Sequence, residues 1–326
     1  MSTTVAVTRS TQATGFFRPR RLGHVNFYVA DVERSMAFYT RVLGLEEVYR
    51  TPLGGGGFVS NGNTHHDVGF TDARGPLGAP RGARPGQLSH LALELESERE
   101  LVRSYERATQ AGITFLRTTD HDIAHSVYGL GPEGVVYELY ADVVKDWRSQ
   151  RSGIVTKAKP AWAPGLTPPV GEPCYHENPP IRRVPDAVFH PLRTTHAAIV
   201  VTDMERALEH YTAVIGLQLA AGAPGDAFAV LSGSCAERSV VLVRAGAARR
   251  PGFHHVGLRV ASVAELAESV TKAREAGVRI DLDVVHAGRR AVFVRDPDGF
   301  LVQLYADDAG EPALDAIDPD LALYVL

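Results

Sequence analysis

The sequence predicts an α+β fold built from two similar modules in tandem. Three observations predict it: an internal repeat, the same order of strand-like and helix-like segments in both copies, and a Pro/Gly-rich stretch between them. The chain has 326 residues, of which 44% are hydrophobic and 22% are charged. This length and composition suit two globular domains of roughly 100–200 residues, each with its own core.

The repeat consists of two blocks that align without gaps. Residues 22–45 (LGHVNFYVADVERSMAFYTRVLGL) align with residues 194–217 (TTHAAIVVTDMERALEHYTAVIGL) at an offset of 172. The segments that begin at Leu88 and Ser126 align with those that begin at Phe253 and Ala291 at an offset of 165. Because only the loops between the blocks differ in length, by a net seven residues, the pattern indicates a duplication.

Each copy begins with an alternating apolar strand, HVNFYV in the first and HAAIVV in the second. The Asp that follows, Asp31 or Asp203, is expected to cap a helix. In the first copy this helix ends at Gly44, and its apolar positions are Met36, Phe38, Tyr39, Val42 and Leu43.

The rest of each copy predicts several strands and one more helix. Strands with Gly-rich turns, such as residues 53–58, come first, and LALELE forms another strand. Residues 98–111 have the pattern of an amphipathic helix that Gly112 closes. ITFLR, HSVYGL and VVYELYA complete a βαβββ order, which occurs twice with about 120 residues per repeat.

These patterns divide the chain into five parts. We expect a disordered tail over residues 1–20, a first module over 21–144, a linker over 145–193, a second module over 194–309 and a C-terminal tail over 310–326. The Pro- and Gly-rich linker is too irregular for a folded module and long for a simple connection. It is therefore expected to wrap across one of the domains.

Composition argues against several classes of protein. The formal net charge of −4 does not suit a surface for nucleic acid or for an anionic membrane. Cys174 and Cys235 form no CxxC motif, so we expect no disulfide framework, in keeping with a reducing cytosol. No apolar run approaches the roughly 20 residues of a membrane helix, and the first residues lack a signal-peptide core. We therefore expect a cytoplasmic protein that binds neither membrane nor nucleic acid.

Three polar residues stand within otherwise apolar strands of the first copy: His24 in GHVNFYV, His90 in SHLALEL and Glu138 in VYELYA. Burying such a residue is costly unless it is paired or bound to a metal. A single histidine in a strand is more often structural, but three such residues in one module favour a metal site. Two imidazoles and one carboxylate on one face of a metal, with open positions opposite, are the ligand set of mononuclear Fe(II) enzymes. We expect Fe(II), with Mn(II) as the alternative.

The second copy is an internal control. It keeps His196 and His255 but has Gln303 in the place of Glu138. A neutral amide lacks the negative charge that helps to hold a divalent cation. We expect one tight site, in the first module, and weak coordination by Gln303 stays open at this stage.

At these residues the sequence resembles the vicinal oxygen chelate superfamily and, within it, the type I extradiol ring-cleaving dioxygenases, which are similar to catechol 2,3-dioxygenase. The resemblance covers both repeats. Residues 119–138 fit the extradiol signature at His121, Val127, Tyr128, Pro132, Gly134 and Glu138, whereas Gly131 departs from it. The second repeat holds a decayed copy of the signature, with His286, Val292, Phe293, Pro297, Gly299 and Gln303. His65 and His66 are similar to the family's His-His pair, in which the second histidine is the acid–base residue.

The resemblance implies two vicinal-oxygen-chelate modules, each a pair of βαβββ repeats that forms a cup-shaped mixed sheet. It implies catalytic roles for His66, His121 and Tyr128, a catechol-type substrate, and cleavage beside the diol with both atoms of O₂ entering the product. The expected setting is aromatic compound catabolism. The edge strands of such modules favour a homo-oligomer. One feature departs from the familiar two-domain enzymes, in which the C-terminal module holds the iron.

Two other functions remain open on sequence grounds. One is a glyoxalase-like lyase or isomerase that uses Ni, Zn or Mn and consumes no O₂. The other is a metal-free resistance protein that sequesters a ligand on the same fold. Metal content and O₂ uptake would separate these functions, because the fold alone does not identify the reaction.

Overall fold

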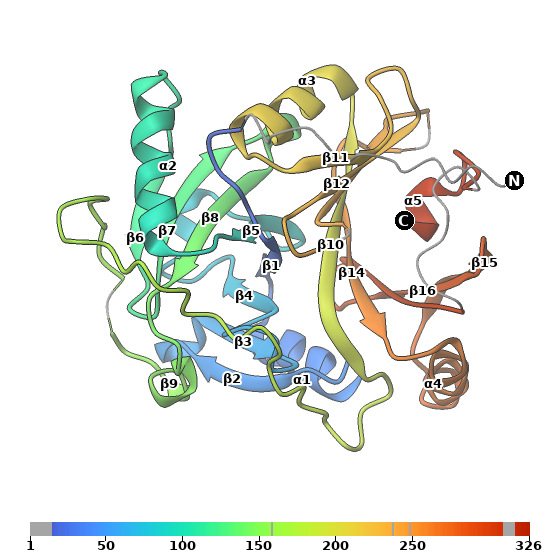
Figure 1. The fold of residues 1–326 in the computed structure, drawn as a ribbon. Helices are drawn as coiled ribbons and strands as arrows, with labels where there is room; N and C mark the ends of the chain where they lie inside the picture. Colours follow the sequence, from blue (N-terminus) through green and yellow to red (C-terminus); the bar gives the residue numbers. More distant parts are fainter. Residues whose placement is uncertain (1–14, 158, 237, 248, 309–316) are drawn as a thin grey trace, which may run out of the picture.

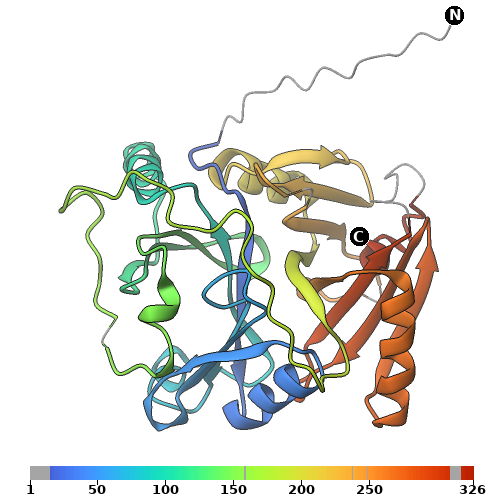
Figure 2. The same ribbon diagram turned by 60° about the horizontal axis from the view of Figure 1, so that its bottom comes forward.

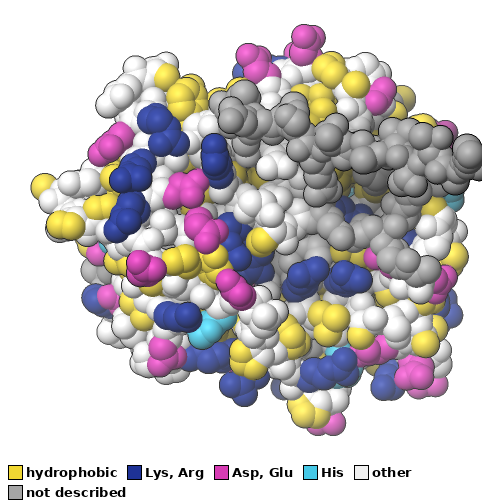
Figure 3. Space-filling view, viewed as in Figure 1, with side chains coloured by type: hydrophobic (Ala, Val, Ile, Leu, Met, Phe, Trp, Pro, Cys, Tyr) yellow, Lys and Arg dark blue, Asp and Glu magenta, His cyan; other side chains and the backbone are white. Residues whose placement is uncertain are grey.

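Two mixed sheets, each curled around its own interior, form the core of the molecule (Figures 1 and 2). The computed structural model describes residues 15–157, 159–236, 238–247, 249–308 and 317–326. Among these residues, no helix is long and apolar enough to cross a membrane. Acidic and basic side chains are interspersed over the face shown in Figure 3.

The first module contains eight strands and two α-helices among the described residues, in the order β1 (Arg21–Val29), α1 (Val32–Arg41), β2 (Glu46–Arg50), β3 (Gly56–Ser60), β4 (Val68–Asp72), β5 (Gln87–Glu94), α2 (Glu98–Gln110), β6 (Arg117–Asp120), β7 (Ala124–Leu130) and β8 (Val136–Asp142). Short 3₁₀ turns lie at Pro52–Gly54, Ala79–Arg81, Pro132–Gly134 and Trp147–Ser149. The linker contributes β9 (Gly153–Ile154), which pairs with β2.

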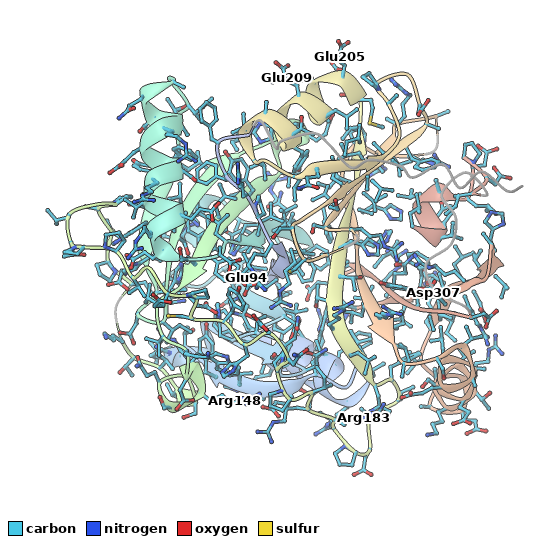
Figure 4. All side chains as sticks on the ribbon, in the orientation of Figure 1. Glu94, Arg148, Arg183, Glu205, Glu209 and Asp307 are labelled. Carbon is cyan, nitrogen blue, oxygen red and sulfur yellow. The ribbon has the colours of Figure 1, made fainter. Side chains whose placement is uncertain are left out.

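The second module repeats this order with β10 (Pro191–Val201), α3 (Met204–Glu209), a π-helical turn (His210–Val214), β11 (Gln218–Ala221), β12 (Phe228–Ser232), β13 (Val240–Arg244), β14 (Gly252–Val260), α4 (Val263–Glu275), β15 (Ile280–His286), β16 (Arg289–Arg295) and β17 (Leu301–Asp307). A short helix, α5 (Ala322–Val325), follows near the end of the chain. Glu205 and Glu209 point outward from α3 in Figure 4.

Strand order confirms the predicted fold class. The first sheet runs β6-β7-β8-β5-β1-β4-β3-β2-β9, and the second runs β15-β16-β17-β14-β10-β13-β12-β11. Register agrees as well, because Val25 pairs with Val68 and Ala197 pairs with Val240, the same spacing in both sheets. Each module is therefore a pair of βαβββ units, as expected from the duplicated sequence.

The predicted helix signals operate in both copies. The carboxylates of Asp31 and Asp203 accept hydrogen bonds from the backbone N–H groups of Arg34 (3.1 Å) and Arg206 (3.0 Å). Gly44 has φ +76°, and a Cβ there would lie 2.1 Å from the carbonyl oxygen of Phe189. Glycine is needed at this position both for the left-handed backbone and for this close approach.

Two element boundaries differ from the sequence prediction. The strand expected at ITFLR begins only at Arg117, because residues 111–116 form the turn and connection that leave α2. The Gly-rich turn expected over residues 53–58 is shorter, since Gly56 already belongs to β3.

The two modules meet through equivalent contacts. The backbone N–H of Ala30 donates to Asp298 at 3.0 Å, and the N–H of Thr202 donates to Glu133 at 2.8 Å. These two bonds are related by the repeat, since Ala30 aligns with Thr202. Phe27 stacks on Phe300, with ring centroids 3.9 Å apart. The two hydrogen bonds therefore use equivalent positions of the two modules.

Part of the expected N-terminal tail is packed. Residues 1–14 lie outside the described residues, but Phe17 is fully buried. Arg20 and Arg21 both pair with the buried carboxylate of Glu94, at 2.7 Å and 2.8 Å, toward the centre of the molecule in Figure 4. The prediction of a disordered tail is thus wrong for residues 15–20, because burial of Phe17 and these ion pairs fix them.

The linker lies across the first module (Figure 1). The indole ring of Trp162 stacks on His125 at 4.6 Å, and Glu98 accepts a hydrogen bond from the N–H of Val170 at 2.7 Å. The described end of the chain, residues 317–326, packs instead against the second sheet. Part of the expected C-terminal tail, residues 310–316, lies outside the described residues.

Candidate metal centre

Three adjacent strands bring His24, His90 and Glu138 together. His24 lies on β1, His90 on β5 and Glu138 on β8, and Ala92 is the register partner of both His24 and Glu138. Glu138 Oε2 lies 3.2 Å from His24 Nε2 and 2.9 Å from His90 Nε2. One ligand atom from each residue lies within 4.8 Å of the others, and all three residues are buried. The sheet register thus explains how residues far apart in sequence meet.

Burial sets the charge of these groups. Desolvation lowers the pKa of His24 to about 4, although the hydrogen bond and charge of Glu138 oppose the shift. Desolvation also opposes ionisation of Glu138, but the hydrogen bonds from His24 and His90 outweigh it and hold the pKa of this carboxyl well below its usual range. At neutral pH the site therefore holds a neutral His24 imidazole beside an anionic carboxylate, which are the forms that bind metal.

The carboxylate of Glu138 is oriented by a neighbour. Ser126 on β7 donates from its hydroxyl to Glu138 Oε1 at 2.5 Å, which leaves Oε2 on the side of the two imidazoles. His90 Nδ1 lies 3.1 Å from the hydroxyl of Ser89. Such contacts from the residues behind the ligands fix ligand orientation. Two nitrogen donors and one held carboxylate oxygen fit a divalent ion such as Fe(II) or Mn(II).

A second histidine cluster shares His24. Ligand atoms of His24, His65 and His66 also lie within 4.8 Å of one another. This set has no anionic ligand, and His65 Nδ1 lies 3.4 Å from Asp142 Oδ1. We favour the set with Glu138 for Fe(II), because it supplies the carboxylate that completes the two-histidine, one-carboxylate arrangement.

A cavity of about 550 Å³ adjoins the three residues. The predicted catalytic residues His66, His121 and Tyr128 all line it, together with His24, His90 and Glu138. His121 Nε2 lies 3.0 Å from the hydroxyl of Tyr128 and 3.6 Å from Glu138 Oε1. The structure therefore brings all six residues selected from the sequence to one cavity.

His66 lines the cavity and contacts neighbouring rings through its own ring. Its ring lies 3.9 Å from the ring of His24 and packs edge-on against Phe58 at 5.0 Å. Both of its ring nitrogens are buried, and neither has a hydrogen-bond partner among the described residues. Buried polar atoms normally have partners, so these nitrogens are available to a ligand in the cavity.

Desolvation keeps two histidines of the cavity neutral. It is the largest cause that lowers the pKa of His66 and of His121 well below the usual histidine value. It also raises the pKa of Tyr128 well above that of a free phenol. Tyr128 thus keeps its proton and can donate to His121, whose neutral ring can accept.

The sequence analysis missed the residues that complete this site. Ser126 begins an aligned block but was not selected, and its counterpart Ala291 has no hydroxyl, a difference that could have pointed to it. The linker supplies part of the cavity wall through Arg151, Val155, Thr156, Lys157, Lys159 and Ala161. The three basic residues so close together in the linker were the available signal.

The second module keeps the imidazole pair but not the site. The rings of His196 and His255 lie 5.7 Å apart at 85°, close to the 5.6 Å and 78° between His24 and His90. The side-chain amide of Gln303 donates to the carbonyl oxygens of Tyr324 (3.1 Å) and Leu326 (3.3 Å). In the part of the chain that the structure describes, this module has no group of three His, Cys, Asp or Glu residues close enough together to hold a metal ion.

Comparison with known proteins identifies both modules. The model of a family described as the Glyoxalase/Bleomycin resistance protein/Dioxygenase superfamily matches residues 21–139 and 193–304. The chain is 31% identical over 134 residues to the 2,2',3-trihydroxybiphenyl dioxygenase of Sphingomonas paucimobilis. That match covers 39% of this chain and 42% of the relative, so the chain matches less than half of the relative's length.

Solved structures share the whole fold. The 2,3-dioxygenase LapB from Pseudomonas sp. KL28 matches with a TM-score of 0.65 and 17% identity, over 92% of this chain and 96% of that chain. The Mn(II)-bound glyoxalase from Novosphingobium aromaticivorans matches with a TM-score of 0.64 and 17% identity, over 92% and 90%. At this identity the likeness concerns the fold, which hosts more than one chemistry.

Proposed function

This chain belongs to the Glyoxalase/Bleomycin resistance protein/Dioxygenase superfamily, and we propose that it is an Fe(II)-dependent extradiol dioxygenase. It would cleave the ring of a catechol beside the two hydroxyls and place both atoms of O₂ in the product. The observation that carries this proposal is the position of His66, His121 and Tyr128 around the same cavity as His24, His90 and Glu138. A metal triad alone would serve several reactions, whereas these groups suit a substrate that carries acidic hydroxyls.

His24, His90 and Glu138 would hold the metal. Bound Fe(II) would supply the Lewis acidity and the redox chemistry that a reaction between a catechol and O₂ requires. Ser126 keeps one oxygen of Glu138 turned toward the imidazoles, which maintains the ligand geometry through turnover.

His66 would move the protons. Its ring is buried and neutral, and both nitrogens lack a protein partner among the described residues. A neutral imidazole can accept a proton from a catechol hydroxyl at one nitrogen and return it later in the reaction. Phe58 packs against the edge of His66 and limits the positions that the ring can adopt.

Tyr128 and His121 would orient the substrate. Their side chains are 3.0 Å apart and form a hydrogen-bonded pair at the wall of the cavity. Arg117 lies over the ring of Tyr128, 3.7 Å from its centroid, and holds it against the sheet. When His121 donates from Nε2 to the phenol oxygen instead, the hydroxyl of Tyr128 can donate to a substrate oxygen.

A glyoxalase-like reaction is the second candidate, because the fold also matches a Mn(II)-bound glyoxalase. The two differ in their use of O₂. The test is to load the protein with Fe(II) under anaerobic conditions and then to mix it with a panel of catechols in air-saturated buffer. O₂ uptake is recorded together with the yellow colour of a ring-fission product. Uptake of one O₂ per catechol supports the proposal. No uptake across the panel with iron fully loaded would refute it.

A further inference from the structure

The linker carries positive charge into the cavity. Five basic side chains line the cavity. Arg81 and Arg117 come from the first module, and Arg151, Lys157 and Lys159 come from the linker. The one carboxylate among the lining residues that the structure describes is Glu138, which is assigned to the metal. A cavity with this balance attracts an anion more strongly than a neutral ligand.

Four of these cations already have contacts that account for them. Arg151 lies 3.5 Å from a carboxylate oxygen of Asp122 and donates to the backbone oxygen of His121. Lys157 also pairs with Asp122. Arg117 covers the ring of Tyr128, and Arg81 donates to the backbone oxygen of Leu77.

Lys159 differs from the others. Within the described residues its ammonium has no hydrogen bond or ion pair, and its ring contact is with Phe58, whose centroid lies 5.3 Å away. The residue as a whole is solvent-exposed. Its ammonium nevertheless loses hydration in the cavity, and this desolvation, with the charge of Arg151, lowers the pKa of Lys159 to about 8. An anion in the cavity would restore the interaction that water no longer supplies.

The position of Lys159 relates it to the reacting groups. Phe58, beneath its ammonium, also packs edge-on against His66. Lys159 lines the same cavity as His66 and His121, and its positive charge contributes, behind desolvation, to the lowered pKa of both histidines. Tyr49 stacks on Phe58 with centroids 4.1 Å apart and makes this wall aromatic. A ring that packs on this wall would carry its substituent past the ammonium.

We propose that the substrate is a catechol with a carboxylate on its ring substituent, and that Lys159 pairs with this carboxylate. This inference rests on the proposed dioxygenase function. The cavity volume of about 550 Å³ falls within the roughly 300–1,000 Å³ of pockets that hold drug-sized ligands, so it has room for a substituent beyond the catechol ring. Lys159 is then a specificity residue that the linker, and not either sheet, contributes.

The experiment compares acids with their uncharged amides. Two pairs place the substituent differently on the ring: 3,4-dihydroxyphenylacetate and 3-(2,3-dihydroxyphenyl)propanoate, each with its primary amide. The kcat/KM for O₂ uptake and the anaerobic Kd by calorimetry are measured for the wild type, Lys159→Met and Lys159→Glu. Lys145→Met is the matched control, because Lys145 is an exposed lysine of the same linker outside the cavity.

The wild type should prefer at least one acid over its amide by about tenfold in kcat/KM and Kd, which is the scale of one charge-assisted hydrogen bond. Lys159→Met should remove this preference and leave the amide within about twofold. Lys159→Glu should reverse it in favour of the amide, and Lys145→Met should behave as the wild type.

Equal use of acids and amides by the wild type, or an equal effect of Lys159→Met on both, would overturn the inference while the dioxygenase function stands. If no catechol consumes O₂, the dioxygenase function fails, and the calorimetric preference for acids still decides whether Lys159 binds a carboxylate.

Discussion

The two modules have almost the same sheet but different interiors. In the first, the strands surround a cavity of about 550 Å³ beside His24, His90 and Glu138. In the second, the corresponding face is covered by the chain's own residues 317–326, and Ile317, Leu323, Val325 and Leu326 are buried against Val200 and Val241. The comparison teaches that the scaffold for two imidazoles survives without the site, which depends on a few side chains and on an open interior.

Those few side chains can be read from the alignment. Glu138, Ser126 and Tyr128 correspond to Gln303, Ala291 and Phe293, and the register of β4 and β13 places Arg238 where the first module has His66. Under the proposed assignment, each change removes a ligand, its orienting hydroxyl, a substrate donor or the acid–base group. Because the changes lie at separate positions, each difference between the modules can be tested with a single substitution.

The largest effect is expected from Glu138→Gln, which gives the first module the ligand set of the second. Loss of the anionic ligand should lower the affinity for Fe(II) by at least about 100-fold and abolish O₂ uptake. Metal content of the dialysed protein, measured by mass spectrometry, checks this. Gln303→Ala is the control and should keep the metal. The opposite pattern would place the site in the second module.

His66→Ala should act on chemistry more than on binding. We expect kcat to fall by about 10²–10⁴-fold, the usual contribution of a general acid–base group, with KM changed little. Metal content should stay at the wild-type level, because His66 is assigned no ligand role. Loss of the metal in this variant would favour the histidine cluster of His24, His65 and His66 as the ligand set.

Ser126→Ala copies the change to Ala291 and should have an intermediate effect. Without the hydroxyl that holds Glu138 Oε1, the affinity for Fe(II) should fall by about 10–100-fold, as for other residues behind metal ligands. Calorimetric titration with Fe(II) under anaerobic conditions measures it. Unchanged affinity would mean that Ser126 does not position the carboxylate.

Leu323→Ala tests the filled interior of the second module. Removal of this buried side chain should lower the free energy of unfolding by about 2–5 kcal/mol, measured by urea denaturation. Iron content and kcat should change little, because Leu323 packs in the second module and not beside the cavity. A loss of activity without a loss of stability would contradict this division of roles.

The last prediction concerns pH and applies to both modules. Desolvation lowers the pKa of His24 to about 4 and that of His196 and His255 well below 6.5. The unfolded chain therefore binds more protons than the folded chain below pH 6.5. The resulting stability is complete above this pH and falls as pH drops toward 4, by up to about 1.4 kcal/mol per pH unit for each histidine. Denaturation of the metal-free protein at pH 7 and pH 5 measures the slope, and a flat profile would contradict neutral histidines.

Sequence patterns predicted what depends on local chemistry or on strand register. Asp31 and Gly44 signalled the ends of a helix, and the duplicated strands placed His24 beside His90 and Glu138. Sequence could not predict the path of the linker, because an irregular segment has no periodicity that tells which surface it covers. The contribution of Lys159 and Arg151 to the cavity wall could therefore not be predicted from the sequence.

The ends of the modules were unpredictable for a similar reason. Phe17 lies in a segment with a polar, tail-like composition, yet its buried ring packs edge-on against Phe115 at 6.0 Å and its carbonyl oxygen approaches Gly216 of the other module. The occupation of the second interior by Leu326 and its neighbours also depends on distant contacts. In both cases tertiary packing, and not local propensity, decides the structure.

The central claim is one metal site per chain, located in the first module. The most direct test is a calorimetric titration of the metal-free wild-type protein with Fe(II) under anaerobic conditions. The account predicts one tight site per chain, which Glu138→Gln removes and Gln303→Ala retains. Two equivalent sites per chain, or a single site that persists in Glu138→Gln, would contradict it.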